Sequence, residues 1–243
     1  MLRTLAERLS RNIVLRRRLP HDLGGHFIYV TPESALNFWF PGLERADHGY
    51  LMDMVRRFVA RDSIAWDVGA NVGLFSFAAA AKARTVLAVE PDPWLAALLN
   101  RSASAITNVR VLCAAVADSL DLGELNIAQR GRSANFMSGF GTSQTGGVRS
   151  RQPVVTVTLD WLAERFPLPD IIKIDVEAGE RLVLQGGTAL FNRARPHLVC
   201  EVASANSPWV TNFLLCLGYS LLDEHLKPTS VAIDNIVAVP SGL

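Results

Sequence analysis

Trp66-Asp67-Val68-Gly69-Ala70-Asn71-Val72-Gly73 stands between an apolar run at 64–68 and an alanine-rich run at 74–81. This order predicts a strand, a tight glycine turn and then a helix. A turn of this kind presents open backbone N–H groups at the start of the helix, where they bind the polar end of a small ligand. The stretch therefore predicts the binding site of a nucleotide-like cofactor, and the other motifs decide which cofactor it is.

The composition is that of one globular α/β domain. The chain has 243 residues, 49% of them hydrophobic, and a formal net charge of +1, with a mean hydropathy of +0.21. A chain of this length buries a substantial core, and the high hydropathy suits a sheet that is covered on both faces. No apolar run reaches the roughly 18 residues of a membrane span, and the N-terminus lacks the apolar segment of a secretory signal. The net charge gives no pull toward nucleic acid, so we expect a cytoplasmic protein that does not bind nucleic acid.

Neither the cysteines nor the histidines indicate a metal. Cys113, Cys200 and Cys216 are scattered among apolar neighbours, which predicts buried free thiols. The chain has no metal-ligand spacing of His, Cys or Asp residues, so we expect no metal site.

From residue 61 onward, apolar strands alternate with helices, which predicts βαβ units, a parallel sheet and one globular domain over residues 61–243. The predicted strands are 64–68, 86–90, 109–116, 171–176, 198–202, 219–222 and 235–239, and the predicted helices are 74–81, 94–101, 180–191 and 209–217.

Residues 1–60 predict an N-terminal extension packed on this domain. Residues 1–20 carry six arginines against one glutamate, and apolar residues recur among them at helical spacing. This pattern predicts an amphipathic basic helix, which either packs on the domain or contacts an anionic membrane surface or a protein partner. An aromatic stretch at 27–40 follows, and it suits a sugar-binding surface, core packing or the interface of a homo-oligomer equally well.

The segment 129–151 interrupts the alternation. It contains five glycines and four arginines, and no Asp or Glu occurs from residue 125 to residue 159. We predict a long loop that is either a basic lid attracting an acidic substrate or a solvated flexible connection.

The spacing of the glycine turn argues against a dinucleotide. Dinucleotide-binding turns need a second glycine so that the backbone can approach a pyrophosphate, and Asn71 stands at that position here. A phosphate-cradling G-x-x-x-x-G-K-[ST] pattern is also absent. The helix N-terminus still favours a carboxylate, so a cofactor with a carboxylate and a ribose but no phosphate fits better. S-adenosylmethionine is such a molecule.

Glu90 supports this choice. It ends the second predicted strand, just before Pro91, and lies 21 positions after Gly69. An acidic side chain at the tip of that strand accepts hydrogen bonds from both ribose hydroxyls. We therefore predict that Glu90 holds the ribose.

A second cluster of charges follows the predicted strand 171–176. Lys173, Asp175 and Glu177 share one face of this otherwise apolar strand, and charges buried in a covered sheet must be paired. Catalytic groups in open α/β sheets gather beyond the carboxyl ends of the strands. We therefore expect Asp175 and Glu177 to line a substrate cleft, with Glu201 at the end of the next strand.

In order and spacing, four motifs resemble the FkbM-type family of S-adenosylmethionine-dependent methyltransferases. They are the 66–73 turn, Val89-Glu90-Pro91, Thr158-Leu159-Asp160 and the 173–180 block. The resemblance covers roughly residues 60–205 and implies the Rossmann-like class I methyltransferase fold. That fold is a mostly parallel seven-stranded sheet with helices on both faces and one antiparallel strand near the C-terminus. The implied activity is methyl transfer to a hydroxyl oxygen, often on a sugar, glycolipid or natural product. One departure is that the family usually has Gly-Ala where this chain has Ala178-Gly179.

The resemblance also implies how the cofactor lies. Gly69 and Asn71, in the turn that Gly73 closes, would face its methionine end, and Asp67 would order its amino group. Glu90 would bind the ribose, and Asp118 either accepts from the adenine amino group or caps a turn.

Methyl transfer to a hydroxyl needs the acceptor oxygen placed in line with the S–CH₃ bond and is helped by a base. Asp175, Glu177 and Glu201 are the candidate bases, with Lys173 tuning a carboxylate by pairing. Two alternatives stay open, a nucleotide-dependent oxidoreductase and a cofactor-binding scaffold without turnover.

Overall fold

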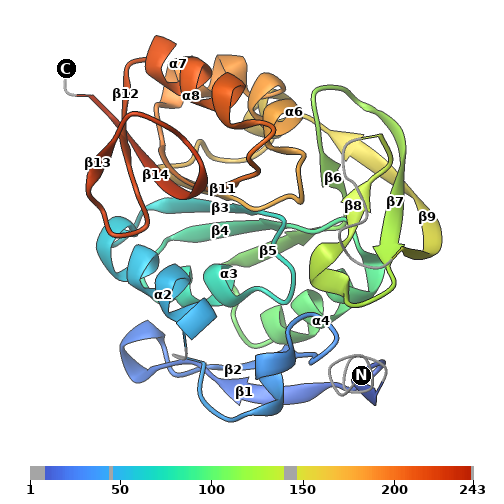
Figure 1. Cartoon of the computed structure of the whole chain (residues 1–243). Coiled ribbons are helices and arrows are strands. Elements are labelled where there is room, and N and C mark those ends of the chain that lie inside the picture. Colours follow the sequence, from blue (N-terminus) through green and yellow to red (C-terminus); the bar gives the residue numbers. More distant parts are fainter. Residues whose placement is uncertain (1–8, 44–45, 140–146, 242–243) are drawn as a thin grey trace.

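The computed structural model describes residues 9–43, 46–139 and 147–241, with the backbone alone for residues 46–48. Its centre is an eight-stranded sheet (Figure 1). In spatial order the strands are β13 (Pro228–Thr229), β12 (Tyr219–Leu222), β14 (Asp234–Pro240), β11 (His197–Val202), β10 (Ile171–Ile174), β3 (Ile64–Val68), β4 (Thr85–Val89) and β5 (Val109–Leu112).

The central strands β11, β10, β3, β4 and β5 pair in parallel, and β14 is antiparallel to both of its neighbours. All five residues of β3 and all four of β10 are buried, as expected for strands covered on both faces. This arrangement confirms the predicted fold class, including the antiparallel strand near the C-terminus. The short β13 adds one strand to the predicted seven.

Helices cover both faces of the sheet (Figure 1). On one face lie α2 (Ala46–Phe58), α3 (Leu74–Ala79) and α4 (Pro93–Ala103), and on the other α6 (Glu180–Gln185), α7 (Thr188–Ala194) and α8 (Ser207–Cys216). The short α5 (Leu159–Ala163) contacts α7. The single helix predicted at 180–191 was wrong, because two consecutive glycines at 186 and 187 interrupt it.

The N-terminal part of the described chain is a hairpin rather than a helix. β1 (Leu15–Arg18) pairs antiparallel with β2 (Phe27–Val30), and β2 packs against α4. The basic helix was therefore a wrong prediction for residues 15–18, and residues 1–8 lie outside the described part. The hairpin forms because Ile28 and Val30 reach the core on one face, while Arg16 stacks its guanidinium on the Phe27 ring on the other, 4.4 Å from the centroid.

A second sheet stands beyond the carboxyl end of β5. Its order is β6-β9-β7-β8, where β9 is antiparallel to β7 and parallel to β6. The strands are β6 (Ala115–Val116), β9 (Val148–Val157), β7 (Asp121–Ala128) and β8 (Phe136–Met137). The predicted loop 129–151 was therefore partly wrong, since it includes β8, the start of β9 and the 3₁₀ turn η3 (Arg132–Ala134). Residues 140–146 of that loop lie outside the described residues.

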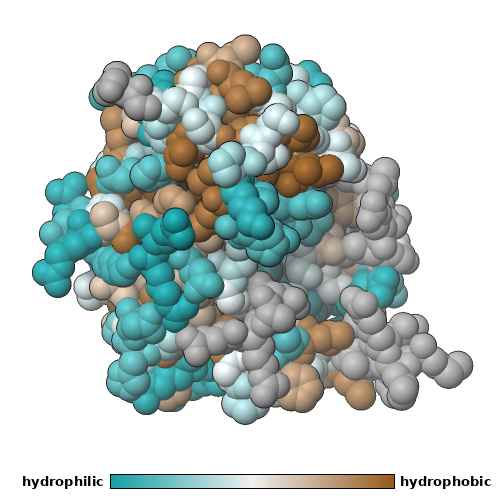
Figure 2. Space-filling model, turned by 60° about the vertical axis from the view of Figure 1, so that its left-hand side comes forward, coloured by the Kyte–Doolittle hydropathy of each residue, from teal (hydrophilic) through white to brown (hydrophobic). Residues whose placement is uncertain are grey.

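The surface is mixed in character. Figure 2 shows the side that lies on the left of Figure 1, where hydrophobic residues gather in the upper half among hydrophilic ones. Exposed apolar side chains near the C-terminal strands include Leu215 and Ile233, and such scattered exposure is ordinary. Over the described residues, every helix is too short or too polar to cross a bilayer.

The three cysteine thiols are free, as predicted. Cys200 in β11 is buried, but Cys113 and Cys216 are exposed, so their predicted burial was wrong. Cys113 follows the end of edge strand β5, and Cys216 is the last residue of α8, where less of the chain covers a side chain.

Ala178 has the left-handed backbone conformation, with φ +64°, whereas Gly179 has φ −93°. The left-handed residue is thus still the first of the pair, where the resemblance implies a glycine. In this chain that residue is Ala178, which has a side chain. A non-glycine residue there costs about 1–2 kcal/mol.

We expect Ala178→Gly to raise the free energy of unfolding by about 0.5–1 kcal/mol, because relief of the strain exceeds the added entropy of the unfolded chain. Chemical denaturation measures it. The matched control is Ala97→Gly, at an exposed position within α4, which should lower stability by about 1 kcal/mol. A similar loss of stability in both variants would contradict the backbone strain assigned to Ala178.

Candidate functional site

A buried lysine joins the two central strands of the sheet. Lys173 lies opposite Asp67 in the β10–β3 register, and its side chain is only 5% exposed. Its Nζ donates to the Gly69 carbonyl oxygen at 2.7 Å and lies 3.1 Å from Asp67 Oδ1 and 3.3 Å from Asp175 Oδ2. Burial by itself would lower the pKa of Lys173, but the two carboxylates outweigh it, so the pKa is raised and the ammonium stays charged.

Asp67 connects this lysine to the next helix. Its Oδ2 accepts hydrogen bonds from the backbone N–H and the hydroxyl of Ser76, at 3.1 and 2.6 Å. Asp67 is fully buried, and Gly73 precedes α3 with φ +86°. Asp67 and Gly73 therefore hold the glycine turn in place, and neither lines one of the two cavities described below.

The turn itself is shaped by the end of β10. Gly69 has φ +73°, and an added Cβ would lie 1.9 Å from the Asp175 carbonyl oxygen. Asn71 also adopts a left-handed conformation, φ +52°, which Asn tolerates better than most residues. The side-chain oxygen of Asn71 is buried and has no hydrogen-bond partner among the described residues.

Glu90 closes the other side of the turn. Its carboxylate is 5% exposed and accepts from the backbone N–H groups of Asn71 at 2.8 Å and Asp92 at 2.9 Å. Burial raises the pKa of Glu90 to about 7, since it outweighs these two donors. Glu90 is therefore poised to gain further hydrogen-bond donors from a ligand.

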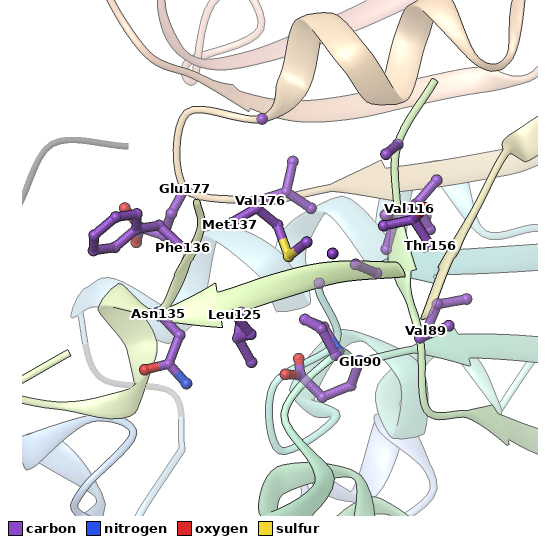
Figure 3. Close-up of a pocket in the computed structure, with 18 of the residues that line it drawn as sticks. Val89, Glu90, Val116, Leu125, Asn135, Phe136, Met137, Thr156, Val176 and Glu177 are labelled. Atoms are coloured by element: carbon purple, nitrogen blue, oxygen red, sulfur yellow. The ribbon is translucent and has the colours of Figure 1, made fainter. Parts of the chain in front are cut away.

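Gly69, Asn71 and Glu90 line a first cavity of about 280 Å³, which lies between the carboxyl ends of β3 and β4 and the second sheet. In Figure 3, Glu90 lies in the lower part of the view with Leu125 beside it and Val89 to its right, and Phe136 and Met137 of the second sheet lie above them. Among the described residues, the lining carries six carboxylates and one guanidinium, that of Arg132. The six acidic residues are Glu90, Asp118, Asp121, Glu124, Asp175 and Glu177.

The guanidinium of Arg132 is already neutralised. It pairs with Asp92 and Glu33 and lies over the Trp94 ring, 4.8 Å from the centroid. Arg149 also pairs with Glu33, at 2.7 Å. The hypothesis that segment 129–151 presents free arginines to an acidic substrate is therefore wrong for these two side chains.

A second cavity, of about 460 Å³, opens on the other side of the turn. It shares three lining residues with the first, Asn71, Ser133 and Asp175. Lys173 and Glu201 line only the second cavity, and Glu177 lines only the first. The two cavities therefore meet at the end of β10, beside Asp175.

The candidate bases are separated by this arrangement. The strand β10 ends at Ile174, so Glu177 lies in the following turn and not on the strand face expected for it. Partial burial raises the pKa of Glu177 to about 7, and nearby Asp175 adds to the rise. Partial burial and then Asp175 likewise raise the pKa of Glu201 to about 7. Asp118 is exposed and lines the first cavity just beyond β6.

The family model for the methyltransferase FkbM domain matches residues 67–221. The chain belongs to the FkbM methyltransferase family. The crystal structure of methyltransferase FkbM from Methylobacillus flagellatus KT matches 78% of this chain and 47% of its own, at 16% identity and a TM-score of 0.51. Precorrin-6y C5,15-methyltransferase from Geobacter metallireducens GS-15 matches 81% of this chain and 90% of its own, at 12% identity and a TM-score of 0.49.

This FkbM domain spans about half the length of the Methylobacillus chain. At 16% identity that likeness concerns the fold alone. A comparison with curated proteins found no match.

Several residues of the FkbM site have no signal in the sequence. Asp92 lies two positions after Glu90 in the sequence, but its bond to Arg132 joins residues 40 positions apart. Glu33, Tyr50 and Ser34 come from the N-terminal extension. Only folding brings them to the site, so no local pattern could have found them.

We expect Lys173→Met to destabilise the FkbM domain by about 3–5 kcal/mol, because it leaves the buried Asp67 carboxylate without its counter-charge. Thermal and chemical denaturation measure the loss. The exposed Lys227→Met is the matched control, with an effect within about 0.5 kcal/mol.

Adding Asp67→Asn to Lys173→Met should recover part of the stability, because it removes the unpaired charge and keeps an acceptor for Ser76. Wild-type stability in the single variant would contradict the role given to Lys173.

Proposed function

We propose that this domain binds S-adenosylmethionine in the first cavity and transfers its methyl group to a hydroxyl oxygen of an acceptor in the second. The observation that carries the proposal is the set of carboxylates around the first cavity, opposed by one arginine that is already paired. An acid-lined cavity attracts a cation and repels an anion.

S-adenosylmethionine fits this lining. It carries a sulfonium and an ammonium against one carboxylate, so its net charge is positive, and it has no phosphate, whereas a nicotinamide dinucleotide would bring a pyrophosphate among six carboxylates. A pyrophosphate needs free cations or open N–H groups, but the N–H of Asn71 already donates to Glu90. This argues against the oxidoreductase alternative.

The residues that would hold the cofactor follow from their chemistry. Glu90 would accept the ribose hydroxyls, and Asp118 would accept from the adenine amino group. The turn at Gly69 and Asn71 would face the methionine end, where the Asn71 side-chain oxygen lacks a partner among the described residues and suits an ammonium donor.

The cofactor would supply an activated methyl group: the acceptor oxygen would form the new C–O bond, and the electron pair of the broken S–CH₃ bond would stay on sulfur. The residues must orient that oxygen and remove its proton. We propose that Glu201 accepts this proton, because its pKa of about 7 suits a base at neutral pH. Asp175, which borders both cavities, would orient the hydroxyl, and Lys173 would hold Asp175 in place.

The scaffold alternative rested on the exchanged Ala178-Gly179 pair. The left-handed conformation at Ala178 keeps the turn that a glycine would give, and the Ala178 carbonyl oxygen accepts from Asn206 at 2.9 Å. The exchange therefore gives no reason to expect a displaced Glu177, and turnover is the function we propose. A sugar, glycolipid or natural-product hydroxyl is the acceptor class.

We expect S-adenosylmethionine to bind with 1:1 stoichiometry in isothermal titration calorimetry and NADH not to bind. Glu90→Ala should weaken the binding by at least about tenfold, because it removes a buried acceptor of two ribose hydroxyls. The charge-matched control is Glu164→Gln, an exposed residue that pairs only with its neighbour Arg165 among the described residues, and it should bind normally.

The same titrations have an expected pH dependence. Lowering the pH from 8 to 6 protonates Glu90, whose pKa is about 7, so the affinity of the wild type should fall by about tenfold more than that of Glu90→Gln. Undetectable binding by the wild type, or equal affinity in Glu90→Ala, would contradict the proposal.

A further inference from the structure

Among the described residues, the lining of the second cavity has more carboxylates than its single lysine, Lys173, can pair with. Three carboxylates line it, those of Asp175, Glu201 and Glu224. The Lys173 ammonium already serves Asp67 and Asp175, so Glu201 and Glu224 have no lysine or arginine partner among the described residues. Glu224 lies 3.5 Å from His225, which is exposed and pairs only when protonated.

An aromatic ring stands beside these two carboxylates. Tyr50 of α2 lines the cavity together with Phe38, Glu201 and Glu224, and burial, followed by Cys200, Glu224 and Glu201, raises the pKa of its phenol. The Tyr50 hydroxyl is buried without a hydrogen-bond partner among the described residues. A cavity lined by a phenol ring and by two carboxylates is a favourable environment for an organic cation.

A second orphan group lines the same cavity. Ser34 is 1% exposed, and its hydroxyl has no hydrogen-bond partner among the residues that the structure describes. Buried polar groups are nearly always satisfied, so this hydroxyl and that of Tyr50 indicate a polar ligand. Ser34 comes from the N-terminal extension, which thus completes the wall of the cavity.

We propose that the acceptor carries a protonated amino group beside its hydroxyl, as a 2-amino sugar does, and that Glu224 and the Tyr50 ring bind this ammonium while Glu201 accepts the proton of the hydroxyl. The inference rests on the proposed function, because it names the substrate class of the same site. Ser34 and Tyr50 would then bond the remaining hydroxyls of the acceptor.

Other classes of acceptor fit the cavity less well. A uronic acid or a sugar phosphate would bring a negative charge against three carboxylates. A neutral sugar would bring no opposite charge to Glu201 and Glu224, which are exposed and would keep water as their partner. Within the described residues, no three His, Cys, Asp or Glu side chains are arranged to hold a metal ion, which favours an organic cation as the compensating charge.

The test is a titration of the full chain with glucosamine, glucose and N-acetylglucosamine. Calorimetry is run without cofactor and again with S-adenosylhomocysteine. We expect glucosamine to bind at least about tenfold more tightly than either neutral sugar, as one charge-assisted hydrogen bond would give. Glu224→Gln should remove most of this preference, and Tyr50→Phe should keep the ring and weaken all three sugars alike. Glu164→Gln, which lies outside the cavity, should change nothing.

The outcomes separate this inference from the proposed function. Equal affinity for the three sugars, or an undiminished preference in a Glu224→Gln protein with wild-type melting temperature, overturns the amine site. A preference that depends on Glu224 supports it whether or not methyl transfer is detected, since the readout is binding. Absence of S-adenosylmethionine binding would overturn the proposed function alone.

Discussion

The ion centre of Lys173 is the constraint on which the rest of the site depends. One ammonium, buried between β3 and β10, holds a carboxylate in β3, a carboxylate just past the end of β10 and the carbonyl of the glycine turn. Breaking such a centre leaves an uncompensated charge in the core. Because Lys173 fixes Gly69 and Asp175 together, the turn and the end of β10 cannot move apart, and the two cavities keep their common border.

The distribution of charge then gives each side of that border its character. The basic side chains near the first cavity are paired with acidic ones. Arg132 pairs with Asp92 and Glu33, and Arg149 pairs with Glu33. Acidic residues of both cavities keep a surplus. Carboxylates that are partly buried and lie near one another rise in pKa, as Glu177 and Glu201 do. A cation bound in each cavity would offset this surplus of negative charge. The proposed cofactor and the proposed acceptor each carry such a cation.

The sequence predicted those parts of the fold that short-range patterns encode. The apolar runs of β3 and β4, the turn between β3 and α3 and the position of Glu90 all follow from residues within about 25 positions of one another. The match of residues 67–221 to the FkbM methyltransferase domain confirms the resemblance read from these motifs.

What the sequence did not predict depends on partners far along the chain. β1 forms because Phe27–Val30 pairs with it. The first residues of β9, 148–151, were predicted as part of a glycine- and arginine-rich loop, although β7 pairs with them. Glu33 meets Arg132 and Arg149 only after folding. The candidate site was therefore predicted on its sheet side, whereas the walls supplied by the N-terminal extension and the second sheet were not.

The most direct measurement of the central claim is transfer of a labelled methyl group from S-adenosylmethionine to a hydroxylated acceptor, with the product identified by mass spectrometry. The account predicts a labelled methyl ether, formed in equal amount with S-adenosylhomocysteine, and a large loss of the product in Glu201→Gln. Intact labelled cofactor after incubation of the folded protein with amino sugars, neutral sugars and a glycan extract would contradict it.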